Sequence, residues 1–196
     1  MTRRFPNTVL IVAAIVALVV LGGVAAIVHI RSAGPDGTLP LAGTVAHFSL
    51  SNPRLPAPDA VVSDPDGKSL SLASFRGRVV LVNFWATWCI PCLKEMPTLD
   101  GLEKALGGPD FTVAVVSIDR GGAATAAPWL EQNGIKSLTL YLDPESRAAF
   151  AFKANELPAS VLIDRKGRVV GRMTGPAEWD APEAKALIRA VMAEPS

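Results

Sequence analysis

The sequence predicts an α/β domain whose largely parallel sheet is closed by an antiparallel hairpin. Apolar, β-branched runs at 78–85 and 111–119 are typical of strands that are covered on both faces. Helical patterns alternate with these strands, and two strands joined by a short turn come late in the chain. A Cys-x-x-Cys pair stands where the first run gives way to a helical pattern, at the end of a central strand where α/β sheets place their sites.

The expected elements begin with a turn sequence, Asp-Pro-Asp-Gly at 64–67, between two short strands. Residues 70–75 are expected to be short helical or irregular structure, and 91–106 a helix with apolar residues at helical spacing. Asp143 is expected to be the N-cap of the helix that follows it. The remaining elements are expected in the order helix, strand, helix, strand, strand, helix, at 123–132, 138–142, 144–153, 160–164, 169–174 and 181–193.

An uncharged run of aliphatic residues and glycines extends from Val9 to Val28. At about 1.5 Å per residue, a helix of this length spans a hydrocarbon core of roughly 30 Å. Arg3 and Arg4 precede the run, which favours a cytoplasmic N-terminus and an exported remainder. We therefore expect 1–8 to be cytoplasmic and 9–30 to be a transmembrane signal anchor. A cleaved signal peptide is the alternative, but its apolar core is usually shorter, about 7–15 residues.

Residues 31–58 are rich in Pro, Gly, Ser and Ala and are expected to form a linker with a short strand or turn near 45–50. Residues 59–196 are then the folded domain, which is large enough to bury a core. The net charge is +1, so nothing in the charge balance indicates a nucleic-acid partner. The predicted topology is single-pass in a bacterial inner membrane, with the domain in the oxidising periplasm. A cysteine pair there needs a redox partner to be reduced.

Cys89 and Cys92 are the two cysteines of the sequence. The unpaired N–H groups and positive end of a helix favour a thiolate at Cys89. The three-residue spacing lets Cys92 reach back, whereas a structural disulfide more often links distant parts of a chain. Zinc usually takes four ligands, and the sequence has no second Cys/His pair. We therefore predict a redox-active dithiol that uses no metal and no other cofactor.

The segment 83–97, Asn-Phe-Trp-Ala-Thr-Trp-Cys-Ile-Pro-Cys-Leu-Lys-Glu-Met-Pro, resembles the membrane-anchored thioredoxin-like reductases of the TlpA/ResA/CcmG group. Leu-Pro-Ala-Ser-Val-Leu-Ile-Asp at 157–164 and Gly-Pro-Ala-Glu-Trp at 175–179 are most similar to its TlpA-like members. The resemblance implies a thioredoxin-like fold with an N-terminal β-hairpin extension and a central insertion, preceded by one transmembrane helix. It also implies a protein-disulfide reductase that acts on exported proteins.

Cys89 is the predicted nucleophile, partly exposed, which attacks a substrate disulfide and forms a mixed disulfide. Cys92, more buried, then attacks Cys89 and releases the reduced substrate in a fast intramolecular step. Ile90 and Pro91, between the cysteines, are expected to tune the reduction potential and to face substrate. Trp88 resembles the surface tryptophan of the group and is expected to shield the site.

The resemblance implies that Glu95 assists proton transfer, and its spacing puts it on the same helix face as Cys92. A solvated helix glutamate is the alternative. Asn83 stands where ordinary thioredoxins have a buried aspartate, and this strengthens the case for Glu95. Bonds preceding proline are cis in only about 5% of cases, but the resemblance implies a cis bond between Leu157 and Pro158. Residue 157 would then offer a backbone edge that pairs with substrate as a strand does.

The resemblance implies partners as well. Exported disulfide proteins in cytochrome oxidase copper-site or cytochrome c maturation are the expected substrates, among them a copper chaperone or an oxidase subunit. A membrane thiol transporter is the expected electron donor. A copper(I) metallochaperone is the alternative, because soft thiolates of Cys89 and Cys92, with His47, suit copper(I). A peroxidase on this fold would need a cysteine outside the pair, and the sequence has none.

Overall fold

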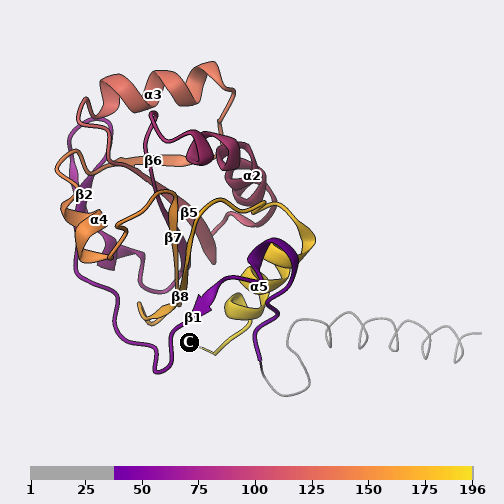
Figure 1. The fold of residues 1–196 in the computed structure, drawn as a ribbon. Helices are drawn as coiled ribbons and strands as arrows, with labels where there is room; N and C mark the ends of the chain where they lie inside the picture. Colours follow the sequence, from indigo (N-terminus) through magenta and orange to yellow (C-terminus); the bar gives the residue numbers. More distant parts are fainter. Residues whose placement is uncertain (1–37, 196) are drawn as a thin grey trace, which may run out of the picture. The chain divides into compact units, whose positions relative to one another are not determined.

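An eight-stranded sheet runs through the part of the chain that the computed structural model describes, residues 38–195. Its strand order is β1-β8-β7-β4-β5-β6-β2-β3 (Figure 1). The parallel neighbours are β4, β5 and β6, whereas β7 and β8 are antiparallel, as predicted. The strands are β1 (Ser49–Leu50), β2 (Val61–Ser63), β3 (Ser69–Ser71), β4 (Val79–Trp85), β5 (Phe111–Ser117), β6 (Thr139–Leu142), β7 (Ala159–Ile163) and β8 (Val169–Thr174).

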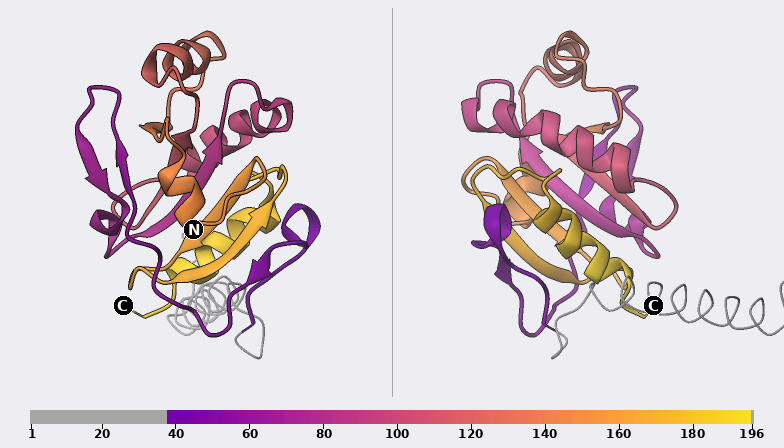
Figure 2. Two further views of the ribbon diagram at one scale, coloured as in Figure 1. Left: turned by 60° about the vertical axis from the view of Figure 1, so that its left-hand side comes forward. Right: turned by 90° about the vertical axis from the view of Figure 1, so that its right-hand side faces the viewer.

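Helices cover both faces of the sheet, with α2 and α5 on one face and α4 on the other (Figure 2). This explains why β4 and β5 are buried at every position and show no alternation of polar and apolar residues. The helices are α2 (Ile90–Leu106), α3 (Ala123–Gln132), α4 (Arg147–Ala151) and α5 (Pro182–Met192), with 3-10 turns η1 (Gly43–Val45) and η2 (Leu72–Phe75).

Successive residues of β4 face opposite sides of the sheet. Val80, Val82 and Phe84 pack into the apolar cluster that includes Phe152, next to α4. Asn83 therefore faces the other side, toward α2, and its amide hydrogen-bonds a side chain of that helix. This alternation decides which residues of the central strand can reach the helix that carries the cysteines.

Two additions surround the central elements. The strands β2 and β3 pair as an antiparallel hairpin through the predicted turn, where Gly67 has the positive φ that favours glycine. They form the predicted N-terminal hairpin extension. Between β5 and α4 the chain forms α3 and β6, and β6 lengthens the sheet beyond β5. This segment occupies the position of the predicted central insertion.

The start of α4 differs from the prediction. The helix begins at Arg147, not at 144, because the preceding residues form a turn in which Ser146 N–H donates to the Asp143 carbonyl oxygen at 2.8 Å. Ser146 is the N-cap residue, with φ 55°. Asp143 still binds the helix start, since its Oδ2 accepts a hydrogen bond from Ala149 N–H at 2.8 Å. Asp143 therefore accepts a hydrogen bond from the first turn of α4, although it lies three residues before the N-cap residue Ser146.

The compact unit begins at Pro40 and so includes most of the predicted linker at 31–58, and the short strand or turn expected near 45–50 is present as η1 and β1. Val45 and Phe48 are buried, and β1 pairs with β8. A Cβ atom on Gly171 would lie 2.5 Å from the Ser49 carbonyl oxygen, so the absence of a side chain there permits this approach. Two apolar anchors thus fix a segment whose composition is typical of a linker.

The predicted cytoplasmic segment 1–8 and signal anchor 9–30 lie outside the described residues. Within residues 38–195, no helix combines the length and the apolar composition that crossing a membrane requires.

Candidate active site

The two cysteines lie at the start of α2, just beyond the carboxyl end of β4. Cys89 is the N-cap residue of the helix, Cys92 lies in its first turn, and the two form a disulfide with a Cα–Cα distance of 5.3 Å. The backbone N–H of Cys92 donates to Cys89 Sγ at 3.3 Å. First-turn amides have no partner within their helix, so these donors favour a thiolate at Cys89 after reduction.

The surface around the disulfide is apolar. Cys89 is 5% exposed and Cys92 is fully buried. Cys92 is therefore the more buried of the two, as predicted, but Cys89 is less exposed than expected. The flanking residues Trp88 and Ile90 are 66% and 67% exposed, whereas Pro91 is half-buried. The two sequence neighbours of Cys89 therefore present exposed apolar surface that a partner can contact.

The turn before Cys89 is held by Asp119, a buried residue beyond the end of β5. Its carboxylate accepts hydrogen bonds from Thr87 N–H at 3.0 Å, Thr87 Oγ1 at 2.8 Å and Ser117 Oγ at 2.8 Å. No role for Asp119 was predicted from the sequence. An acidic residue at the end of an apolar parallel strand, beside the strand that leads into the cysteines, is the signal that could have identified it.

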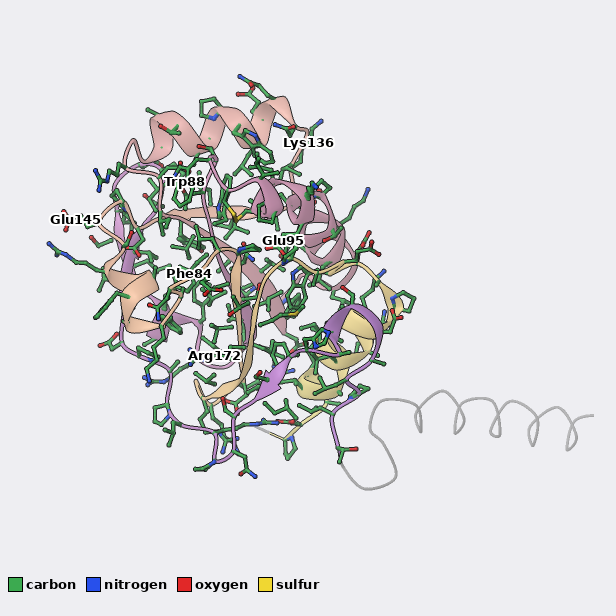
Figure 3. All side chains as sticks on the ribbon, viewed as in Figure 1. Phe84, Trp88, Glu95, Lys136, Glu145 and Arg172 are labelled. Atoms are coloured by element: carbon green, nitrogen blue, oxygen red, sulfur yellow. A yellow bond between two sulfur atoms is a disulfide. The ribbon has the colours of Figure 1, made fainter. Side chains whose placement is uncertain are left out.

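Glu95 lies one turn after Cys92, packed among the side chains of the interior (Figure 3). It is 2% exposed, so the alternative of a solvated helix glutamate is wrong. Its Oε1 accepts from Asn83 Nδ2 at 2.8 Å, and its Oε2 accepts from Ala177 N–H at 3.1 Å and Trp179 Nε1 at 3.2 Å. Burial raises the pKa of Glu95 from its ordinary 4.5 to about 7, although the three hydrogen bonds oppose this shift.

Asn83 joins β4 to both α2 and β7. Its Nδ2 donates to Glu95 and, at 2.9 Å, to Ser160 Oγ. Its Oδ1 is buried and has no hydrogen-bond partner among the described residues. The neutral amide supports the carboxyl group of Glu95 without adding a second charge to the interior.

The peptide bond between Leu157 and Pro158 is cis, as the resemblance implied. Pro158 is buried, and its carbonyl oxygen accepts from Gly175 N–H at 2.9 Å. Leu157 is half-buried, and within the described residues its backbone has no hydrogen-bond partner. The backbone of residue 157 is therefore free to pair with another chain.

An open pocket of about 460 Å³ lies beside Glu95. It is lined by Thr44, Lys94, Glu95, Thr98, Pro176, Ala177 and Glu178. The pocket gives the buried carboxyl group a path along which it can exchange a proton with solvent. Within residues 38–195, no group of three or more His, Cys, Asp or Glu side chains is arranged to hold a metal ion, and His47 is exposed.

The structure thus brings Cys89, Cys92 and Glu95 together on the first two turns of α2. The sequence analysis noted Gly-Pro-Ala-Glu-Trp at 175–179 only as a likeness, yet this segment supplies two of the three donors to Glu95. The pattern of residues along one chain does not show that a loop far from a helix closes over it.

Comparisons with known proteins agree with this geometry. The sequence matches the Redoxin family over residues 53–188. It is 33% identical over 119 residues to the thiol-disulfide oxidoreductase ResA of Bacillus anthracis, covering 61% of this chain and 68% of that protein.

Two solved structures have the same fold. A protein assigned as the thiol:disulfide interchange protein DsbE from Chlorobium tepidum superposes with a TM-score of 0.64 at 27% identity, covering 71% of this chain and 97% of that one. The exposed lipoprotein thioredoxin of Streptococcus pneumoniae superposes with a TM-score of 0.53 at 29% identity, covering 63% and 94%. The predicted thioredoxin-like α/β fold is confirmed.

Proposed function

The chain belongs to the Redoxin family, and from this premise we propose that it is a membrane-anchored periplasmic reductase of disulfides in exported proteins. It is a thiol-disulfide oxidoreductase of the ResA/DsbE type, with Cys89 and Cys92 as its disulfide-forming pair. The observation that carries the proposed exchange chemistry is the disulfide at the N-terminus of α2, with a buried carboxyl group one turn further along. The proposed direction, reduction of the substrate, follows from the resemblance to the TlpA/ResA/CcmG group.

The proposed reaction begins with the reduced pair. The Cys89 thiolate attacks one sulfur of a substrate disulfide, so that a mixed disulfide forms and the second substrate sulfur leaves as a thiolate. Cys92 then loses its proton and attacks Cys89 Sγ, which breaks the mixed disulfide and releases the other substrate sulfur. Two electrons pass to the substrate, whose two thiolates take up protons, and the enzyme is left with the disulfide seen in the structure.

Glu95 is the proposed acceptor of the Cys92 proton. A general base works best when its pKa lies near the working pH, and burial brings the pKa of Glu95 to about 7. The carboxyl group follows Cys92 by three residues on the same helix, and the pocket beside it offers the proton a way to solvent. Asn83 carries no charge and cannot serve as the acceptor.

The proposed substrate surface surrounds Cys89. Trp88 and Ile90 are exposed apolar side chains that can pack against a partner, and Pro91, in the first turn of α2, is half-buried. The backbone of Leu157, which has no hydrogen-bond partner within residues 38–195, is the proposed edge that pairs with a substrate segment in the manner of an added strand. Main-chain pairing of this kind accepts many sequences, which suits an enzyme that acts on protein disulfides.

The proposed location rests on the apolar run Val9–Val28 and its preceding arginines. The pneumococcal neighbour is named an exposed lipoprotein, which supports a site of action outside the cytoplasm. The resemblance to TlpA-like proteins supports substrates in cytochrome oxidase copper-site or cytochrome c maturation, including a copper chaperone or an oxidase subunit. A membrane thiol transporter is the proposed electron donor, because the cytoplasmic reductants lie across the membrane.

Trapping of the mixed disulfide tests the mechanism. The Cys92→Ser variant should hold a disulfide-bonded copper-site peptide on Cys89, and the matched Cys89→Ser variant should hold none. Trapping by neither variant, or by Cys89→Ser alone, would contradict the assigned roles. The equilibrium with glutathione tests the direction of electron flow. A reduction potential of about −250 mV supports a reductase, whereas one of about −120 mV indicates an oxidant.

The location is tested separately in spheroplasts. A membrane-impermeant maleimide should label the reduced cysteines of the full chain without lysis. Labelling only after lysis would place the domain in the cytoplasm and refute the proposed topology.

A further inference from the structure

We propose that Trp179 is a positioning residue for the dithiol reaction, which holds the carboxyl group of Glu95 in place through its indole N–H. This inference rests on the proposed role of Glu95 as the acceptor of the Cys92 proton. Trp179 follows β8 in the segment 175–179, whereas Glu95 lies on α2. The two residues are therefore joined only by the fold.

The donors converge on the carboxyl group from two sides. On one side Asn83, on β4, donates to Oε1 at 2.8 Å. On the other, Ala177 N–H and Trp179 Nε1 both donate to Oε2, at 3.1 and 3.2 Å. Trp179 is fully buried, so water does not compete for its N–H. A buried carboxylate without such partners is strongly disfavoured, and the indole is one of three groups that allow Glu95 to ionise.

The segment that carries the indole is itself fixed on α2. Thr98 Oγ1 accepts a hydrogen bond from Trp179 N–H at 3.0 Å. Its single proton can be donated to the Glu95 carbonyl oxygen at 2.8 Å or to the Ala177 carbonyl oxygen at 3.2 Å. The other side is held by Thr44 of η1, whose Oγ1 accepts from Glu178 N–H at 2.7 Å. Thr98 lies one turn after Glu95 on α2. The helix that carries the carboxyl group therefore also holds the backbone of the residue that carries the indole.

A second tryptophan provides the comparison that isolates this hydrogen bond. Trp85, at the end of β4, is also fully buried, but its Nε1 has no hydrogen-bond partner among the described residues. Replacing either indole with phenylalanine removes a buried N–H and part of a ring. Only at Trp179 does the change also remove a donor from Glu95.

Loss of the indole N–H should raise the pKa of Glu95 and shift the pH dependence of the exchange rate upward. A hydrogen bond to the charged form of an acid lowers its pKa, so loss of the indole N–H makes Glu95 hold its proton more tightly. Glu95 then remains protonated to higher pH and cannot accept the Cys92 proton there. The exchange rate should therefore begin to rise at a higher pH in Trp179→Phe than in the natural chain.

The experiment compares the full chain with its Trp179→Phe and Trp85→Phe variants. The Glu95 carboxyl group is titrated in the oxidised protein by ¹³C NMR, and the rate of disulfide reduction is measured against pH. In Trp179→Phe both inflections should move up by about one pH unit, and the rate at neutral pH should fall by up to about tenfold. In Trp85→Phe neither inflection should move.

Two outcomes would overturn the inference in different ways. If Trp179→Phe titrates like the natural chain while Glu95→Gln abolishes the inflection in rate, Trp179 has no positioning role and the proposed function of Glu95 stands. If Glu95→Gln keeps that inflection, the proton-acceptor role fails, and the inference about Trp179 fails with it.

A measurement on the natural chain covers the case in which Trp179→Phe does not fold. The sequence has four tryptophans, so selective ¹⁵N labelling gives four indole signals. The Trp179 N–H signal should shift with pH in step with the Glu95 carboxyl signal, whereas the Trp85 signal should stay constant. A Trp179 signal that does not follow Glu95 would refute the inference.

Discussion

The buried carboxyl group of Glu95 should make the folded protein less stable as the pH rises, and Glu95→Gln should remove this dependence. Its pKa rises from an ordinary 4.5 to about 7 on folding because burial disfavours the charged form. Between these values the folded chain binds the proton that the unfolded chain has released. The stabilisation is therefore complete below about pH 4.5 and is lost as the pH rises through about 7.

The magnitude follows from the two pKa values. Each pH unit between them corresponds to about 1.36 kcal/mol, so the free energy of unfolding should fall by about 3 kcal/mol relative to Glu95→Gln. That is a large fraction of the free energy of unfolding of a typical protein, which is roughly 5–15 kcal/mol. Urea unfolding followed by tryptophan fluorescence, at pH 4 to 8, measures this difference. The oxidised protein is used because its disulfide cysteines do not titrate.

The Gln variant is suited to this comparison because the site can accept it. Asn83 Oδ1 lacks a partner, so rotation of the amide lets it accept a hydrogen bond from the new side-chain NH₂ group. Glu103→Gln is the matched control on the same helix. Burial also raises the pKa of Glu103, but this residue is half-exposed, so its effect should be smaller. Parallel stability curves for the natural chain and Glu95→Gln would refute the reasoning.

Two further predictions concern the supports of the site. A chain that begins at Asp59 should be roughly 3–6 kcal/mol less stable than one that begins at Pro40, because the buried side chains of Val45 and Phe48 are removed. Equal urea midpoints for the two chains would contradict this. Asp119→Ala should cost roughly 2–3 kcal/mol and speed amide hydrogen exchange at Thr87, whose N–H loses its acceptor. Unchanged exchange at Thr87 would exclude the proposed support of the turn.

The elements that the sequence predicts well are those with a local pattern. The central strands β4 and β5 are continuous apolar runs, and only a sheet covered on both faces buries such runs. The position of Cys89 at the start of a helix follows from the same boundary between strand and helix. Composition was a poorer guide at 40–58, where Pro, Gly and Ser predict a linker. Val45 and Phe48 are buried in the domain, and the approach of Phe48 depends on Gly171, far away in sequence, where a Cβ atom would collide with Phe48 Cε1.

The environment of Glu95 could not be predicted in this way. Its three hydrogen-bond donors are 12, 82 and 84 residues away in the sequence. A helix face shows a periodic pattern, but whether a glutamate on that face meets solvent or a closing loop depends on tertiary packing. The resemblance implied that Glu95 assists proton transfer, and its burial and three donors support the role proposed above.

Asn83 places a neutral amide, and not a second acid, beside the carboxyl group of Glu95. An ionised aspartate there would face Glu95 where the amide now donates at 2.8 Å, and two like charges at that separation do not both ionise near neutral pH. One proton would then be shared by a coupled pair, and neither group would titrate alone. With Asn83 in place, Glu95 is a single acceptor whose proton affinity is set by burial and by its three donors. An amide at this position of β4 therefore leaves Glu95 to titrate without a coupled acid, which the proposed proton transfer from Cys92 requires.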